Sequence, residues 1–406
     1  MAMQRSKKTV IAAAISTATV AALVGGLTAL PAQAAPAEAT VLGAGSATAV
    51  KGSYLVTLKQ GGSGLKAASA QGKELISEHG GTVRKTFKSA LNGYEAGSLT
   101  AQEARRLAAD PAVASVEQNQ RVRSDATQSN APWGLDRIDQ ANLPLSSTYT
   151  YPDSAGSGVT AYVIDTGVRI SHAEISGRAV NGYDAVDGDT TAQDGNGHGT
   201  HVATTIAGKT YGVAKKAKIV AVRVLDNNGS GTTAGVIAGI DWVTSNHAAG
   251  APAVANLSLG GGVSTTLDNA VKRSIADGVS YAVAAGNSGA NASSSSPARV
   301  AEAITVGATS NTDAKASWSN YGSVLDIFAP GVSITAGWNT SDSATNTISG
   351  TSMATPHVAG AAAIYLAGHT SATPAQVATA LVNGSTPNKV TSPGSGSPNR
   401  LLKIVS

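Results

Sequence analysis

Short apolar runs alternate with helix-like runs between residues 158 and 370. Strands are predicted where the runs are apolar and rich in β-branched residues, at 159–164, 219–225, 254–259, 280–285 and 303–306. Helices are predicted between them, for example over 233–245 and 265–277. Near-continuous apolar strands that alternate with helices are typical of a parallel sheet covered on both faces. The pattern therefore predicts an α/β domain with its chemistry at the carboxyl ends of the strands.

Ahead of this domain the pattern predicts a small α+β unit over 51–123. Strands are expected at 53–58, 82–87 and 113–117, and a helix over 73–79 stops at two glycines. A second helix is predicted from Thr100, because Thr100 and Glu103 have the spacing of a capping box. Residues 35–50 are small and featureless, and we expect a linker there. After residue 371 we expect a helix and a peripheral tail.

Residues 1–34 have the pattern of a secretory signal peptide. A basic start is followed by an apolar run and by Ala32-Gln33-Ala34, which is a small-x-small cleavage site. We place the cut before Ala35 and predict a secreted protein. The apolar run is also about long enough to span a bilayer, so an uncleaved membrane anchor is the alternative. No later stretch predicts a transmembrane helix.

Composition narrows the function classes. The 406 residues include no cysteine, which excludes disulfides and cysteine metal sites. Residues 1–125 hold 14 Lys and Arg against 8 Asp and Glu, whereas residues 126–406 hold 15 against 17. The basic charge therefore belongs to the N-terminal part. Because no basic stripe is visible, we expect no nucleic-acid partner.

Three stretches beside glycine turns carry candidate catalytic residues. Asp165 follows an apolar strand, His198 lies between two glycines, and Ser352 follows Gly350-Thr351. A helix-forming run follows Ser352, which places the serine at a helix start, where free N–H groups can stabilise an anion. Each residue alone has a plainer interpretation: Asp165 suits a turn, and Ser352 suits an N-cap. His198 and His201 could also be zinc ligands on one helix face, although no third ligand is placed to complete the site.

Together these stretches supply an acid, a base and a nucleophile in the chain order Asp, His, Ser. A serine needs a base within hydrogen-bond reach, and the base needs a partner that fixes its tautomer. The α/β-hydrolase alternative requires the order Ser, Asp, His and the motif Gly-x-Ser-x-Gly, which Ala354 breaks. The combination therefore indicates acyl transfer by a serine nucleophile.

The three motifs resemble the active-site motifs of the subtilisin-like serine proteases, and residues 126–135 resemble the mature start of the proteinase K and aqualysin group. The resemblance implies a three-layer α/β fold with a mainly parallel central sheet. It makes Ser352 the nucleophile, His198 the general base and acid, and Asp165 the orienting carboxylate, with His201 as a structural neighbour. Asn287 resembles the oxyanion-hole asparagine of the family, although an asparagine there also suits a turn.

The unit at 51–123 resembles the inhibitory propeptide of these proteases. We therefore expect a signal peptide at 1–34, a propeptide at 35–125 and a peptidase domain at 126–406, with the second cut near Asp125–Ala126. The resemblance implies that the propeptide assists folding and blocks the cleft as an intramolecular inhibitor. Protein or peptide substrates are the other expected partners. We expect a monomer that has no membrane contact after processing.

Substrate is expected to bind as an added strand. Two glycine-containing segments and a wall of small residues resemble the family's substrate-binding parts, although the glycines also suit ordinary loops. They comprise Gly229, Ser230, Gly231, Ser258, Leu259, Gly260, Ala284, Ala285 and Gly286. The small wall predicts a roomy, apolar S1 pocket. We therefore expect broad cleavage after large apolar or aromatic residues.

Structural calcium is implied by the same resemblance. Asp326 matches a calcium-binding aspartate of the proteinase K group, with the carbonyls of Ala301 and Ala303 as partners. Asp136, Asp139 and Gln140 resemble a second site of aqualysin-like members. An aspartate near a further family site is replaced by Ala141. Calcium prefers six to eight oxygen ligands, and the alternative for each site is a set of ordinary surface carboxylates.

The main hypothesis is a secreted serine endopeptidase that is stabilised by calcium. A catalytically silent relative that acts as a binding module is the second hypothesis. A membrane-tethered processing protease of narrow specificity is the third, and it requires the N-terminal apolar segment to persist.

Overall fold

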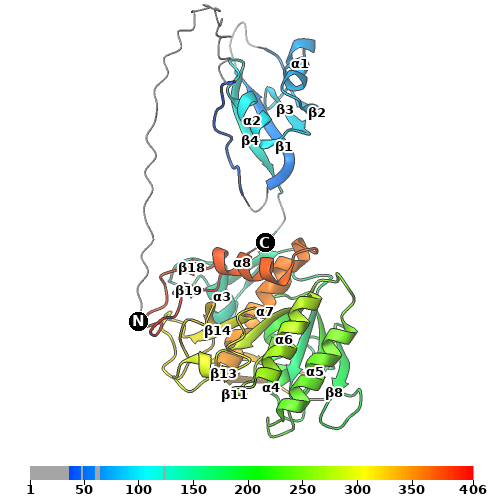
Figure 1. Ribbon diagram of the computed structural model, residues 1–406, viewed down its shortest axis with the longest axis vertical. Helices are drawn as coiled ribbons and strands as arrows, with labels where there is room; N and C mark the ends of the chain where they lie inside the picture. Colours follow the sequence, from blue (N-terminus) through cyan, green and yellow to red (C-terminus); the bar gives the residue numbers. More distant parts are fainter. Residues whose placement is uncertain (1–35, 47–48, 60–64, 122–124, 406) are drawn as a thin grey trace, which may run out of the picture. The chain divides into compact units, whose positions relative to one another are not determined.

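The computed structural model describes residues 36–46, 49–59, 65–121 and 125–405. The chain divides into two compact units, residues 1–122 and 123–406 (Figure 1). The signal peptide predicted at 1–34 lies outside the described residues. Among the described residues, no helix combines the length and the apolar character that a membrane span requires.

The first unit is a four-stranded antiparallel sheet with two helices. The strand order is β2-β3-β1-β4. The elements are β1 (Ala49–Leu58), α1 (Ala70–Glu78), β2 (Thr82–Phe87), β3 (Gly93–Gly97), α2 (Ala101–Ala108) and β4 (Val113–Gln120). The Thr100–Glu103 capping box is present at the start of α2, as the sequence predicts. The sequence does not predict β3, because this five-residue strand begins and ends with glycine and Tyr94 is its only aromatic residue. Tyr94 is fully buried in the core of the unit.

The expected linker at 35–50 is partly structured. The N–H of Leu42 donates to the carbonyl of Val116, and the N–H of Gln118 donates to the carbonyl of Leu42. This segment therefore lies along β4, and β1 already begins at Ala49.

The second unit is built on a nine-stranded sheet. The strand order is β18-β19-β15-β14-β12-β10-β7-β9-β8, and every neighbouring pair is parallel except β18 with β19. The main strands are β7 (Thr160–Asp165), β8 (Ala179–Asp184), β9 (Lys218–Arg223), β10 (Ala253–Leu257), β12 (Ser280–Ala284), β14 (Ile304–Thr309) and β15 (Ile327–Pro330). The five predicted strands are all present.

Helices cover both faces of this sheet, as Figure 1 shows. The helices α4 (His198–Ala207) and α7 (Thr351–Gly368) pack on one face, and α5 (Thr233–Asn246) and α6 (Thr265–Asp277) pack on the other. Fourteen of the eighteen residues of α7 are buried, so this helix runs through the core rather than along the surface. The predicted three-layer α/β architecture is confirmed.

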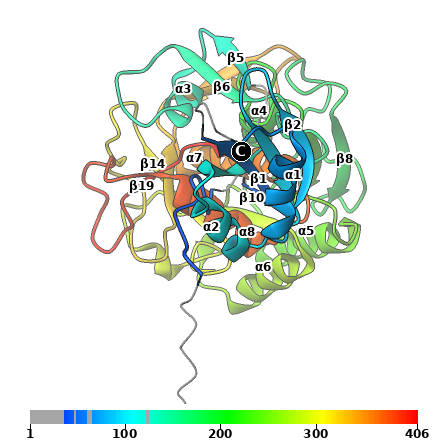
Figure 2. The same cartoon turned by 90° about the horizontal axis from the view of Figure 1, so that it is seen from above.

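Smaller elements complete the unit. Figure 2 shows β5 (Asp125–Ser129) and β6 (Thr148–Pro152) side by side next to α3 (Trp133–Asp139). Two further antiparallel pairs are β11 (Gly261–Gly262) with β13 (Ser295–Ser296), and β16 (Ile334–Gly337) with β17 (Thr345–Ile348).

The chain beyond residue 371 forms α8 (Pro374–Gly384), as expected, but it is not wholly a peripheral tail. The strands β18 (Thr386–Pro387) and β19 (Arg400–Leu401) pair with each other, and β19 pairs with β15. Leu401 is buried there, so its apolar side chain holds the end of the chain on the sheet.

Candidate active site

Asp165 and His198 meet at the carboxyl end of the sheet. Asp165 is the last residue of β7, and His198 is the first residue of α4. The imidazole Nδ1 donates to Oδ1 of Asp165 over 2.7 Å, and the Asp165 side chain is fully buried. The His198 side chain is 24% exposed, so one edge of the ring is open to the cleft. Because Nδ1 carries the proton that Asp165 accepts, Nε2 is left as the basic nitrogen.

The charges around His198 favour its protonated form. Burial disfavours the imidazolium, but the carboxylates of Asp165 and Asp194 outweigh it, so the pKa of His198 is raised above its usual value. A base with a raised pKa accepts a proton more readily in the transition state.

Asp194 holds together the turns that carry Asp165 and His198, a role that the sequence analysis does not predict. Its Oδ1 accepts from Thr166 Oγ1 and from the N–H groups of Asn196 and Gly197, over 2.8 to 2.9 Å. Its Oδ2 accepts from the N–H and the hydroxyl of Thr200. This buried carboxylate therefore ties the turn after β7 to the first turn of α4, which is how the two parts of the Asp165–His198 pair are held together.

Ser352 lies in the first turn of α7, as predicted, but it is not the N-cap. Gly350 occupies the N-cap position in an extended conformation. The Ser352 hydroxyl donates to the carbonyl of Ser258 over 3.0 Å, and the Ser258 hydroxyl donates to the carbonyl of Ser352 over 2.8 Å. In the described part of the chain, no hydrogen bond joins Ser352 to His198. Such bonds often tighten only when substrate binds, and the Ser352 hydroxyl would first have to release the Ser258 carbonyl.

Asn287 lies beyond the end of β12 with a fixed amide orientation. Its Oδ1 accepts from the N–H of Thr351 over 2.9 Å and from the Thr351 hydroxyl over 2.8 Å. Because a backbone N–H can only donate, the oxygen of the amide must face Thr351 and Nδ2 is left as the donor. Thr351 therefore orients the Asn287 amide, which is a second role that the sequence analysis does not predict.

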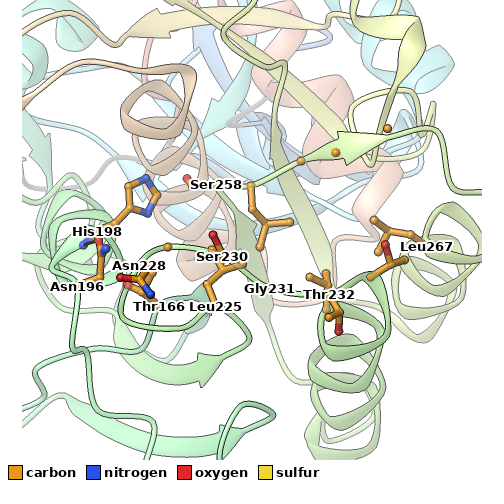
Figure 3. Close-up of a pocket in the computed structure, with 17 residues that line it drawn as sticks. Thr166, Asn196, His198, Leu225, Asn228, Ser230, Gly231, Thr232, Ser258 and Leu267 are labelled. Carbon is orange, nitrogen blue, oxygen red and sulfur yellow. Dashed lines mark hydrogen bonds between the residues drawn. The ribbon is translucent and has the colours of Figure 1, made fainter.

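Two cavities lie at this site: His198 and Ser258 line the first, and Ser352 lines the second. The first has a volume of about 540 Å³, and Figure 3 shows His198 and Asn196 at one end of it, Leu267 at the other, and Ser230 and Gly231 between them. The predicted substrate-binding residues Gly229, Ser230, Gly231, Ser258, Leu259 and Gly260 all line it. A Cβ at Gly231 would lie 2.4 Å from the carbonyl oxygen of Val224, so a larger residue there would move the segment.

The second cavity lies behind Ser352 and has a volume of about 410 Å³. The small wall of Ala284, Ala285 and Gly286 lines it together with Asn287 and Thr351. Among the described residues that line it, none is charged. The lining is less apolar than expected, because Ser288, Ser294, Ser295 and Asn320 also contribute.

Comparison with known proteins decides the family. The sequence model of the subtilase family, peptidase S8, matches residues 156–400, and that of the peptidase inhibitor I9 matches residues 53–125. The chain belongs to the subtilase family.

Relatives of this subtilase match between about two thirds and nine tenths of its length. The extracellular serine proteinase of Thermus sp. (strain Rt41A) is 53% identical over 389 residues, which are 92% of this chain and 94% of that protein. Alkaline serine exoprotease A of Vibrio alginolyticus is 50% identical over 326 residues, 79% of this chain and 60% of that protein. The crystal structure of a cold adapted subtilisin-like serine proteinase matches with a TM-score of 0.66 at 55% identity and covers 68% of this chain and 100% of that chain.

These matches confirm the predicted family, the subtilisin-like fold and the serine endopeptidase class, and they do not favour the silent binding module. The name of the Thermus relative agrees with the predicted extracellular location. The inhibitor match agrees with a propeptide that acts on its own peptidase domain.

The zinc interpretation of His198 and His201 is wrong. His201 Nε2 donates to the carbonyl of Ile334 over 3.0 Å in a fully buried position, and burial lowers the pKa of His201 to about 4. Among the described residues, no three His, Cys, Asp or Glu side chains lie close enough to share a metal ion. His201 is thus a neutral structural neighbour in this subtilase.

The first candidate calcium site lies where β14 begins. Asp326 immediately precedes β15, its Oδ2 accepts from the N–H of Thr305, and its own N–H donates to the Thr305 carbonyl. Burial raises the pKa of the Asp326 carboxyl to about 6, against the Thr305 bond and the charge of Arg400. Ala301 and Ala303 lie in the turn just before β14. A partly buried carboxylate and turn carbonyls are oxygen donors of the kind that fits a hard cation.

The second candidate set lies at the end of α3. Asp136 accepts from Ser146 and Ser147, and Asp139 accepts from the N–H of Thr150. The Gln140 side chain donates to the carbonyls of Asn142 and Pro144. These bonds occupy part of the polar atoms of the set and already hold the 142–150 segment, so this set fits a cation less well than the first.

Proposed function

We propose that this serine endopeptidase cuts proteins outside the cell by an acyl-enzyme mechanism in which Ser352, His198 and Asp165 form the triad. The observation that carries the proposal is the 2.7 Å bond between His198 Nδ1 and the buried Asp165 carboxylate, beside a serine at a helix start. This pair fixes the tautomer that leaves Nε2 free to accept the Ser352 proton.

The chemistry follows from these positions. The Ser352 oxygen attacks the scissile carbonyl carbon while its proton passes to His198 Nε2. The carbonyl oxygen becomes an oxyanion that the Ser352 N–H and Asn287 Nδ2 stabilise. The C–N bond then breaks, and His198 gives the proton to the leaving amine. Water repeats the sequence on the acyl-enzyme and frees Ser352.

The two cavities are proposed to bind different parts of the substrate. A peptide strand that runs between 229–231 and 258–260 would place its residues before the scissile bond along the first cavity. The P1 side chain would enter the second cavity, where the described lining holds no charge that would select Lys or Arg. Broad cleavage after large apolar or aromatic residues is the specificity that this lining supports.

The chain is proposed to be a precursor with the predicted boundaries. The inhibitor-like unit would be removed near Asp125–Ala126, at the start of β5, and the mature peptidase would begin with the strand that pairs with β6. Calcium is proposed at Asp326 with the carbonyls of Ala301 and Ala303, and at Asp136, Asp139 and Gln140. When bound, the ion would stabilise these turns, and it has no part in the bond-breaking steps. The mature peptidase is proposed to be a monomer.

Labelling with a phosphonylating reagent tests the proposal. The secreted chain is treated with a fluorophosphonate, and the adduct is located by mass spectrometry, with Ser352→Ala as the control. An adduct on Ser352 in a chain that starts near Ala126 is the expected result. A folded chain of that length without an adduct would instead support the binding module, and a membrane-bound chain that keeps residues 9–30 would support the membrane-tethered protease.

A further inference from the structure

Asn320 fills the inner side of the bend that follows β12. It lies in the segment between β14 and β15, 30 to 35 residues from the bend, and is 3% exposed. Its Oδ1 accepts from the N–H groups of Ser288 and Ala290, both over 3.0 Å. Its Nδ2 donates to the carbonyl of Ala285 over 2.8 Å. One side-chain amide therefore holds the bend at both ends.

The backbone of Asn320 holds the same bend. Its N–H donates to the carbonyl of Gly286 over 2.9 Å. Gly286 has a φ of 102°, and a Cβ at this position would lie 2.4 Å from Asn320 Nδ2. A glycine is required there because the asparagine amide occupies the space that a side chain would take.

Asn287 lies in the middle of this bend. Its side chain is fixed by Thr351, and its main chain is carried by the segment that Asn320 shapes. Asn320 also lines the cavity behind Ser352, together with Asn287 and Gly286. A change in the bend would therefore move the oxyanion donor and the wall of the P1 cavity together.

We propose that Asn320 is a positioning residue for the reaction, which acts by holding the 285–290 bend so that Asn287 Nδ2 points at the developing oxyanion. This inference rests on the proposed roles of Ser352 and Asn287. Displacement of a catalytic group by about 1 Å can cost roughly 100-fold in rate. A loosened bend should therefore lower kcat more than it raises KM, because the donor is needed most in the transition state.

A double-mutant cycle separates this role from a purely structural one. Asn320→Ala, Asn287→Ala and the double variant are compared by kcat and KM on one peptide substrate. We expect Asn287→Ala to lower kcat by about 100- to 1,000-fold. We expect Asn320→Ala to lower it by roughly 10- to 100-fold with KM changed by less than about threefold. In the Asn287→Ala background, the further loss on removing Asn320 should be less than about threefold, since the residue acts through Asn287.

The matched control is Asn399→Ala. Asn399 is half-buried, and its amide also bridges main chain, since its Oδ1 accepts from the N–H of Val390 and its Nδ2 donates to the Val390 carbonyl. This variant should lose thermal stability while it keeps the wild-type kcat. Multiplicative losses in the Asn320 and Asn287 variants, or a folded Asn320→Ala chain with the wild-type kcat, would overturn the proposal.

Asn320→Asp keeps the inference testable if the alanine variant does not fold. The carboxyl can still accept from Ser288 and Ala290, and in the neutral form that burial favours it can also donate to the Ala285 carbonyl. We expect its kcat to lie below that of the wild type, and we expect this loss to shrink to less than about threefold in the Asn287→Ala background. A wild-type kcat, or a loss that stays the same in that background, would overturn the proposal. The wild-type chain is labelled in parallel, so that failure to label Ser352 would contradict the proposed function itself.

Discussion

Ser352 and Ser258 exchange two hydrogen bonds, each hydroxyl donating to the carbonyl of the other residue. Asn256 Nδ2 also donates to the Ser258 hydroxyl over 2.8 Å, from the fully buried strand β10. Hydrogen bonds thus hold the first turn of α7 against the end of β10. Rotation of Ser352 toward His198 breaks only one of the two bonds.

Ser258→Ala should lower kcat/KM by roughly two- to tenfold. It removes the bond that holds the Ser352 carbonyl and leaves the Ser258 carbonyl in place, and one neutral hydrogen bond contributes about 0.5–1.5 kcal/mol. Steady-state hydrolysis of a peptide substrate measures the effect. Ser274→Ala is the matched control, because Ser274 in α6 is also buried and its hydroxyl accepts from the Tyr281 hydroxyl of β12. A wild-type kcat/KM for Ser258→Ala would show that the hydrogen bond from the Ser258 hydroxyl to the Ser352 carbonyl does not contribute to activity.

The acid limb of the activity profile should lie above the ordinary histidine pKa of about 6.5. Only neutral His198 can accept the Ser352 proton, and the Asp165 and Asp194 carboxylates raise its pKa despite burial. Activity is therefore lost as pH falls through this raised pKa. In Asp165→Asn, kcat should fall by about 10⁴-fold, and the limb should move to lower pH. A limb that stays at the same pH in Asp165→Asn would mean that another group titrates.

Breaking the buried ion pair between Arg137 and Asp313 should strongly destabilise the folded state. Arg137 is fully buried in α3, and its Nε and Nη2 donate to the two Asp313 oxygens over 2.6 and 3.0 Å. Asp313→Ala leaves a buried guanidinium without its counterion, which should cost about 3–5 kcal/mol in free energy of unfolding. Urea unfolding of the phosphonylated enzyme avoids self-digestion during the measurement.

The Arg169–Asp342 pair supplies the control for that measurement. It has a similar 2.6 Å contact, but the Asp342 side chain is 56% exposed. Asp342→Ala should therefore cost no more than about 1 kcal/mol. Equal losses in the two variants would contradict the claim that burial sets the difference.

Removal of calcium should lower the unfolding temperature of the mature enzyme. An ion that binds only the folded state at 100 times its Kd stabilises that state by about 2.7 kcal/mol. Scanning calorimetry of the phosphonylated enzyme with and without EGTA measures the loss. Asp326→Asn should remove the part due to the first site, and Asp136→Asn should remove any part due to the second. An EGTA effect that survives in both variants would place the ion elsewhere.

Local signals determined much of this chain. The helix predicted at 265–277 has those bounds in the structure, because Ser264 caps its start and Gly278 ends it in the left-handed region. The Thr100–Glu103 box and the apolar β-branched strands succeeded for the same reason: each depends on residues within a few positions of one another. The motifs around Asp165, His198 and Ser352 also identified the chemistry, because the turns that present such side chains carry their own glycines.

The tertiary structure decided what depends on contacts between distant residues. The strands β3 and β19 are poor strand sequences by themselves, and they form because neighbouring strands supply hydrogen bonds and cover Tyr94 and Leu401. The hydrogen bonds of Thr351 to Asn287 span 64 residues, and those of Asn320 to the 285–290 bend span 30 to 35. Composition and periodicity report burial and local conformation. They do not report which distant carbonyl or N–H a buried amide will meet, because that is fixed only when the sheet and its helices pack.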